Sequence, residues 1–138
     1  MDDFIGAKVA FFHQDRVLVC LRDNFAHIPW PDHWDLPGGG REGDEGPEDC
    51  LLREVHEEFG LALPADRLIY FRVLPAMMDP TRSSVFFAGR ITEDEIAAIR
   101  FGTEGQCWQM MPVAEFLVNP KAIPEKQRRT RLAWEELR

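Results

Sequence analysis

Two stretches near the N-terminus are dominated by β-branched and large apolar side chains. They span residues 4–12 (FIGAKVAFF) and 16–22 (RVLVCLR), with His13-Gln14-Asp15 between them. Runs of this length and composition are typical of strands, and the polar interval is short enough for a hairpin turn. The pattern therefore predicts a β-hairpin at the start of the chain.

Residues 23–37 interrupt this pattern. The segment carries three prolines, each of which fixes φ and lacks an N–H, so regular structure is not expected over most of its length. It is rich in aromatic side chains and leads into Gly38-Gly39-Gly40, after which an acidic loop runs to Gly46.

The clearest helix is predicted over residues 47–59. Pro47 suits the first helical position, where a missing N–H costs nothing, and Gly60 can supply the left-handed stop. Acidic residues in the first turn are favoured by the helix dipole. At about 100° per residue, one arc of this helix is apolar and should face the core. That arc carries Leu51, Leu52, Val55 and Phe59.

Strands and short helices alternate beyond this helix. Residues 67–77 and 83–91 are predicted to form a long pair of strands joined near Asp79-Pro80. Thr92 is a candidate N-cap, with Glu95 completing a capping box. The remaining predicted elements are a strand over 105–111, a helical turn from Pro112 to Leu117, and a helix over 124–138 docked by Leu132, Trp134 and Leu137. Strands mixed with a few helices predict an α/β fold around a mixed sheet.

Length and charge narrow the class of protein. The chain has 138 residues, of which 45% are apolar, so one domain over residues 1–138 with a packed core is expected. A net charge of -8 gives a surface that repels nucleic acid and anionic membranes. No apolar run approaches the roughly 20 residues of a membrane span. The acidic N-terminus does not resemble a signal peptide. Cys20, Cys50 and Cys107 are odd in number and far apart in the sequence, which favours reduced thiols. We therefore expect a cytoplasmic protein.

Three glutamates on the predicted helix share one face. Glu54, Glu57 and Glu58 have the spacing i, i+3 and i+4, which places their carboxylates together and away from the apolar arc. One interpretation is a solvated acidic face, which tolerates a repulsion of about 0.2–0.5 kcal/mol per pair. The other is a site for Mg²⁺ or Mn²⁺, since these hard cations prefer clustered oxygen ligands.

The wider spacing favours the second interpretation. From Gly39 the chain reads Gly, five residues, Glu45, seven residues and then Arg53-Glu54-Val55-His56-Glu57-Glu58-Phe59-Gly60-Leu61. This segment resembles the Nudix box, GX5EX7REUXEEXGU, in which U is a bulky apolar residue. All of its fixed positions match, and the preceding Trp34-Asp35-Leu36-Pro37-Gly38 resembles the usual approach to the box. The order of elements along the whole chain is also similar to that of the family.

The resemblance implies a fold, an activity and a set of ligands. The fold would be a Nudix-type α/β/α sandwich around a mixed β-sheet. The activity would be metal-dependent hydrolysis of a nucleoside diphosphate linked to another group, by attack of water on phosphorus. The resemblance makes Glu54, Glu57 and Glu58 metal ligands, adds the backbone carbonyl of Gly38, and pairs Arg53 with Glu45. It leaves open whether Glu57 or Glu58 is the general base.

A further glutamate lies outside the box. Thr103-Glu104-Gly105-Gln106 resembles the loop that supplies a distal metal ligand or base in MutT-like members of the family. Glu104 is therefore a candidate for either role, and an ordinary loop carboxylate is the alternative.

Several residues are candidates for binding the substrate. Gly39 and Gly40 let backbone approach phosphates with no Cβ in the way. Arg22, at the end of the second strand, resembles a basic residue that contacts phosphate in the family, although a solvated strand-end charge is the alternative. Trp30 is the better candidate for stacking on a base, whereas Trp34 is expected in the core.

The substrate itself is left open. Met77 stands where ADP-ribose hydrolases of the family tend to have proline, and no tyrosine marks a dinucleoside polyphosphate hydrolase. By elimination, a MutT-like hydrolase of nucleoside triphosphates leads, with nucleotide sugars also possible substrates. The alternatives are a nucleotide-sensing domain and an isoprenyl-diphosphate isomerase. A homodimer is also among the expected partners.

Overall fold

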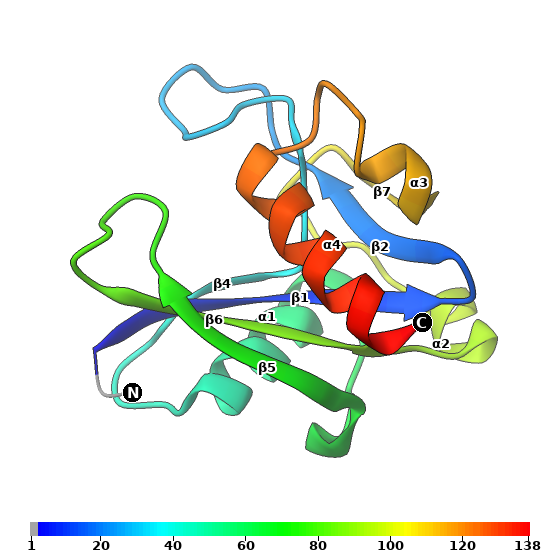
Figure 1. The fold of residues 1–138 in the computed structure, drawn as a ribbon, viewed down its shortest axis with the longest axis horizontal. Coiled ribbons are helices and arrows are strands. Elements are labelled where there is room, and N and C mark those ends of the chain that lie inside the picture. Colours follow the sequence, from blue (N-terminus) through cyan, green and yellow to red (C-terminus); the bar gives the residue numbers. More distant parts are fainter. Residues whose placement is uncertain (1–2) are drawn as a thin grey trace.

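The computed structural model describes residues 3–138 and shows a mixed β-sheet with helices on both faces (Figure 1). Its strands are β1 (Phe4–His13), β2 (Arg16–Leu21), β3 (Trp34–Asp35), β4 (Gly38–Gly40), β5 (Leu68–Pro75), β6 (Ser83–Arg90) and β7 (Cys107–Pro112). Its α-helices are α1 (Pro47–Phe59), α2 (Glu93–Ala97), α3 (Val113–Phe116) and α4 (Pro124–Leu137), and a 3-10 turn spans Ala65–Arg67.

Strand β1 is the centre of the sheet. The strand order is β3-β2-β1-β6-β5, with β4 also beside β1 and β7 beside β2. β1 runs parallel to β6 and antiparallel to β2 and β4, which makes the sheet mixed. β4 pairs with the first half of β1 and β2 with its last residues, so the two strands follow each other along one edge of β1.

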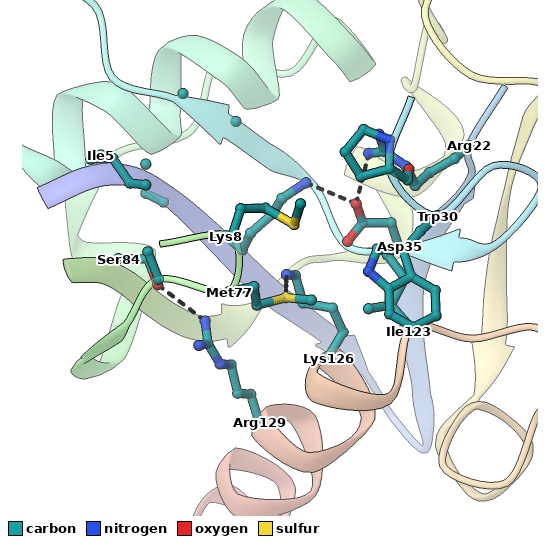
Figure 2. Close-up of a pocket in the computed structure, with 17 residues that line it drawn as sticks. Ile5, Lys8, Arg22, Trp30, Asp35, Met77, Ser84, Ile123, Lys126 and Arg129 are labelled. Atoms are coloured by element: carbon teal, nitrogen blue, oxygen red, sulfur yellow. Dashed lines mark hydrogen bonds and ion pairs between the residues drawn. The ribbon is translucent and has the colours of Figure 1, made fainter. Parts of the chain in front are cut away.

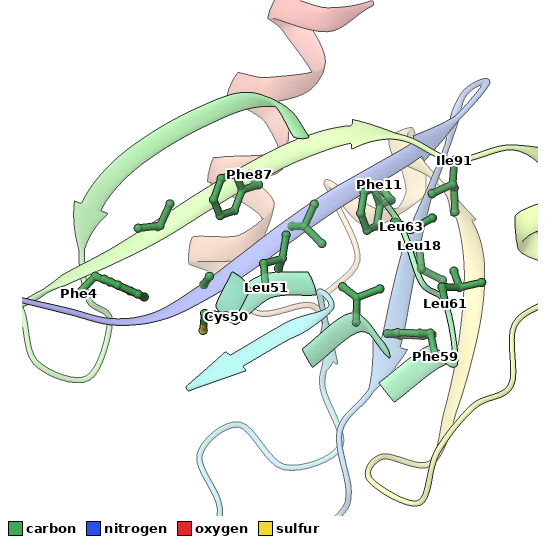
Figure 3. Packing of buried hydrophobic residues seen from close by; sticks show 14 residues of the cluster. Phe4, Phe11, Leu18, Cys50, Leu51, Phe59, Leu61, Leu63, Phe87 and Ile91 are labelled. Carbon is green, nitrogen blue, oxygen red and sulfur yellow. The ribbon is translucent and has the colours of Figure 1, made fainter. Parts of the chain in front are cut away.

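Apolar side chains fill both faces of this sheet. On one face α1 packs through Leu51, Val55 and Phe59 against the strands, as Figure 3 shows. On the other face the core includes Phe12 and Phe86, and it is covered by α3 and α4. The predicted α/β/α sandwich is therefore confirmed.

Local signals in the sequence placed several elements correctly. Helix α1 begins at Pro47 and ends at Phe59, and Gly60 has the left-handed φ of 68° that stops it. The hairpin turns at Gln14 and Asp15, with a φ of 52° at Gln14. The capping box of α2 is present, with Thr92 Oγ1 accepting from the Glu95 N–H at 3.1 Å.

Two short strands were not predicted, and one prediction needs correction. The glycine run forms the strand β4, and Trp34–Asp35 forms the short strand β3 before it. Leu132 was expected to dock the last helix, but 46% of its surface is exposed. Trp134 and Leu137 do pack against the core, whereas the fully buried positions of α4 include Lys126 and Arg129.

Two further observations concern membrane-spanning helices and the cysteines. Across residues 3–138, no helix combines the length and the apolar character needed to cross a bilayer. All three cysteines are free thiols; Cys50, which belongs to α1, is buried, whereas Cys107 is exposed.

Candidate active site

Helix α1 separates its apolar and acidic residues onto two faces. Cys50, Leu51, Val55 and Phe59 are buried against the sheet, so the glutamates of the last turns point away from that contact. Glu54 is almost covered, with 15% of its side chain exposed, whereas Glu57 is 54% exposed. The carboxylates of the helix therefore differ in exposure, from the nearly buried Glu54 to the solvent-facing Glu57.

The glycine strand β4 lies directly against this acidic face. A Cβ on Gly39 would lie 2.6 Å from the carboxylate of Glu54, and a Cβ on Gly38 would lie 2.1 Å from the carbonyl oxygen of Ala7. Gly38 also has a φ of +129°, which side-chain-bearing residues rarely adopt. Only glycine lets β4 fit between β1 and the carboxylates of α1.

Arg53 ties the acidic loop and the glycine strand to α1. Its guanidinium donates to Glu45 at 2.7 and 3.1 Å, and to the carbonyl oxygen of Gly40 at 2.9 Å. The same group donates to Glu54 at 2.9 Å and to Glu57 at 3.2 Å. Hydrogen bonding from Arg53 lowers the pKa of Glu45 to about 2. The predicted pairing of Arg53 with Glu45 is thus confirmed.

Burial disfavours the charged form of two of the three helix glutamates. Burial raises the pKa of Glu58 to about 7, against the attraction of Lys8 and a 3.0 Å hydrogen bond from the Gly38 N–H. Burial also raises the pKa of Glu54, against the pairing with Arg53. Burial thus disfavours the charged form of both carboxylates, and a cation placed beside them would favour it.

The carboxylates do not converge on a single point. Among residues 3–138, the structure contains no group of three or more His, Cys, Asp or Glu side chains arranged to hold a metal ion. Arg53 draws Glu54 and Glu57 to one side, while Glu58 turns to the Gly38 N–H. The donors are nonetheless all hard oxygens, so the residue types fit Mg²⁺ or Mn²⁺.

Glu104 lies with the helix glutamates although it is distant in sequence. It borders a cavity of about 300 Å³, the carboxylate cavity, together with Glu54, Glu57 and Glu58. Its loop is fixed at both ends: the Gly102 N–H donates to the carbonyl oxygen of Glu58, and the Gly105 N–H donates to Asp23. The structure thus brings together the four glutamates that the sequence singled out.

The candidate substrate-binding residues border two adjoining spaces. Arg22, Gly39 and Gly40 line both a central cavity of about 480 Å³, which also reaches Glu54 and Glu58, and a second cavity of about 340 Å³. We call the second space, lined by Lys8, Arg22, Trp30, Asp35, Lys126 and Arg129 among others, the basic cavity (Figure 2). The three cavities form a groove that is acidic at one end and basic at the other.

Trp30 stands at the rim of the basic cavity. It is 37% exposed, has a φ of 50°, and meets the ring of His33 edge-on. Arg22 holds the turn before it by donating to the carbonyl oxygen of Pro29 at 2.9 Å. Trp34 is partly buried and packs against the core, as expected.

Three charged residues of the basic cavity, Lys8, Asp35 and Lys126, were not predicted as site residues from the sequence. Asp35 is buried and accepts from Lys8 at 3.1 Å and from Arg22 at 3.2 Å. Burial alone would raise the pKa of Asp35, but the ammonium groups of Lys8 and Lys126 hold it below its usual value. A lone lysine within an apolar strand was a usable signal for Lys8, whereas Lys126 had none, because its helix is charged throughout.

Comparison with known sequences connects this geometry to a family. A family model described as the NUDIX domain matches residues 5–133. Human diphosphoinositol polyphosphate phosphohydrolase 3-alpha is 36% identical over 80 residues, which cover 58% of this chain and 44% of the human protein. The match therefore spans less than half of that relative.

Solved structures show the same fold. The MutT protein of Methanosarcina mazei Go1 aligns with a TM-score of 0.73 at 17% identity, covering 99% of this chain and 98% of its own. A bifunctional NMN adenylyltransferase/ADP ribose pyrophosphatase from Francisella tularensis, complexed with AMP and a manganese ion, aligns with a TM-score of 0.72 at 18% identity. That alignment covers 97% of this chain and 42% of the larger protein. With a matching family model over nearly its whole length, the chain belongs to the Nudix family.

Proposed function

We propose that this protein is a metal-dependent Nudix hydrolase that cleaves the diphosphate of a nucleoside diphosphate linked to another group, as in a nucleoside triphosphate or a nucleotide sugar. The observation that carries the proposal is that Glu54, Glu57, Glu58 and Glu104 line one cavity beside a glycine strand. The related human phosphohydrolase and the manganese-bound neighbour support it.

The four glutamates would hold Mg²⁺ or Mn²⁺, with the carbonyl of Gly38 as a further ligand. When bound, a divalent cation neutralises phosphate charge and lowers the pKa of a coordinated water. Glu54 and Glu57 would turn from Arg53 toward the carboxylate cavity. Arg53 would keep its contacts with Glu45 and the Gly40 carbonyl, which hold β4 in place.

The remaining residues of the groove would orient the substrate. Gly39 and Gly40 leave room for phosphate oxygens beside β4, and Arg22 offers its guanidinium on the facing side. Trp30 offers a ring at the rim. A glutamate would accept the proton of the attacking water; Glu58, whose pKa is about 7, and Glu104 both lie on the central cavity. A base with a pKa near the working pH is the most effective.

The choice of base can be tested with Glu104→Gln. If Glu104 takes the proton, kcat should fall about a hundredfold with little change in KM, because the interaction forms mainly in the transition state. Steady-state kinetics over a range of Mg²⁺ concentrations would measure this, with exposed Glu93→Gln as the control. Recovery at high Mg²⁺ would make Glu104 a metal ligand only, and a wild-type kcat throughout would return the role of base to Glu57 or Glu58.

The proposed activity itself is tested by a screen. We expect the purified protein to hydrolyse at least one of about fifty nucleotides and diphosphate conjugates in Mg²⁺ or Mn²⁺, giving two phosphate-bearing products, and to be inactive in EDTA. Binding of nucleotides without hydrolysis by the folded protein would indicate a sensing domain instead.

With a net charge of -8, we expect neither a nucleic-acid polymer nor an anionic membrane as partner. A homodimer stays a prediction.

A further inference from the structure

The basic cavity is lined by segments that are far apart along the chain. Its walls come from β1 and β4, the loop after β2, the connection between β5 and β6, and the face of α4 that carries Lys126 and Arg129 (Figure 2). Apolar side chains of Ile5, Met77 and Ile123 form much of the lining. Buried charges in such surroundings require an explanation.

Among residues 3–138, Lys126 is a buried cation that forms no ion pair. Only 6% of its surface is exposed, and its side chain rises from α4 into the cavity. Its Nζ lies 2.9 Å from the sulfur of Met77, which is a weak acceptor. Within residues 3–138, no carboxylate forms an ion pair with it.

The other cations of the cavity are paired. Arg129 is also buried, but it donates to Glu125, Ser84 and the carbonyl oxygen of Pro75 at 2.7, 3.2 and 2.9 Å. Lys8 and Arg22 share the single carboxylate of Asp35.

The net charge of the side chains around Asp35 is therefore positive. Lys8, Arg22 and Lys126 surround one buried carboxylate in a protein whose overall charge is -8. Burial lowers the pKa of Lys126 to about 8, against the attraction of Asp35. An unpaired ammonium in an apolar wall is costly, and a bound anion would remove that cost.

We propose that the basic cavity binds a phosphoryl group of the substrate other than the diphosphate that is cleaved, and that Lys126 determines this specificity. The proposal rests on the proposed hydrolase function and names its substrate class. An ammonium offers three donors and a compact charge, which suit a phosphoryl group. An uncharged nucleobase in the same place could accept a hydrogen bond from the ammonium but would leave its charge uncompensated. The apolar wall and Trp30 would contact the carbon skeleton that carries the phosphoryl group.

Pairs of substrates that differ by one phosphoryl group test this specificity. Suitable pairs are ADP-ribose and its 2′-phosphate, NADH and NADPH, and dephospho-coenzyme A and coenzyme A. In at least one pair, the wild type should prefer the phosphorylated member by about tenfold or more in kcat/KM, the scale of a hydrogen bond to a charged group. Lys126→Met, of similar length, should bring that ratio to within about twofold of one, whereas Arg131→Met on the exposed side of α4 should leave it unchanged. No preference in any pair, or a preference that survives Lys126→Met, would overturn the proposal.

A binding measurement separates this inference from the hydrolase activity. In EDTA, where hydrolysis is not expected, inorganic phosphate at about 10 mM should raise the melting temperature of the wild type and of Arg131→Met, but not of Lys126→Met. Lys126→Met should itself melt no lower than the wild type, since replacing a buried unpaired charge by an apolar group of similar shape is often neutral or stabilising. Lys126→Gln provides a second uncharged variant with the same expected loss of the phosphate effect. Equal shifts in all variants, or none in the wild type, would refute the site even if the protein hydrolyses nucleotides. A loss specific to Lys126 would support it even if the screen finds no hydrolysis.

Discussion

Glu57→Gln is expected to lower kcat by at least about a hundredfold while leaving the protein folded. Glu57 is half exposed and its carboxylate accepts hydrogen bonds from Arg53, so it contributes little to the core. A neutral amide of the same shape keeps the helix but removes one negative oxygen ligand of the proposed metal site. Losses of this size are typical when a major electrostatic or proton-transfer contribution is removed. Steady-state kinetics with the best substrate of the screen, together with a thermal melt, would measure both effects.

Glu48→Gln is the matched control for this variant. Glu48 is an exposed acid in the first turn of the same helix and does not line the carboxylate cavity. It should keep wild-type kinetics, since it loses the same charge at a different place. Full activity of Glu57→Gln, or of the wild type in EDTA, would contradict the assignment of the helix glutamates.

Gly38→Ala is expected to lower the free energy of unfolding by about 3 kcal/mol. The new Cβ would lie 2.1 Å from the carbonyl oxygen of Ala7, and the backbone would have to keep a φ of +129°. Backbone strain and overpacking each cost about 1–3 kcal/mol, and the neighbour here is backbone, which cannot rotate away. For a domain of this size, the melting temperature should fall by on the order of 10 °C.

Gly46→Ala provides the comparison for this loss. Gly46 has a φ of -75° before α1, and nothing lies within 4 Å of a Cβ placed on it. Its melting temperature should stay within about 2 °C of the wild type, since neither strain nor a clash is introduced. If the two alanine variants melted together, β4 would not be held in the close contact that the structure shows.

The fold was predictable where local signals determine it. Proline at the start, glycine at the end and an apolar arc define α1 from sequence neighbours alone. The strand β4 could not be predicted in this way, because three glycines have little strand propensity and pair only through β1, some thirty residues earlier. Likewise, α4 was expected to bury apolar residues, but the cavity beside it takes up Lys126.

Part of the candidate site was likewise predictable from the sequence. Helical spacing places the glutamates of α1 on one face, and the family resemblance was sufficient to predict that Glu104 lies near them. The basic cavity depends on Lys8, Asp35 and Lys126, which come from three distant segments and carry no common spacing. Only the topology of the sheet brings them together, so the pattern of residues along the chain could not reveal their charge balance.

The central strand β1 links the chemistry of the groove to the packing beneath it. Consecutive residues of a strand face opposite sides, so Ala7 and Val9 lie under α1 while Lys8 points to the basic cavity. A slip of one position would bury the ammonium of Lys8 beneath α1 and leave an alanine or valine facing Asp35. The apolar contacts of Val9 with the α1 side thus act as the anchor that keeps a cation in the groove. A core substitution that loosens β1 would consequently displace the ammonium of Lys8 and change the charge of the groove, although the altered residue lies on the other face of the sheet.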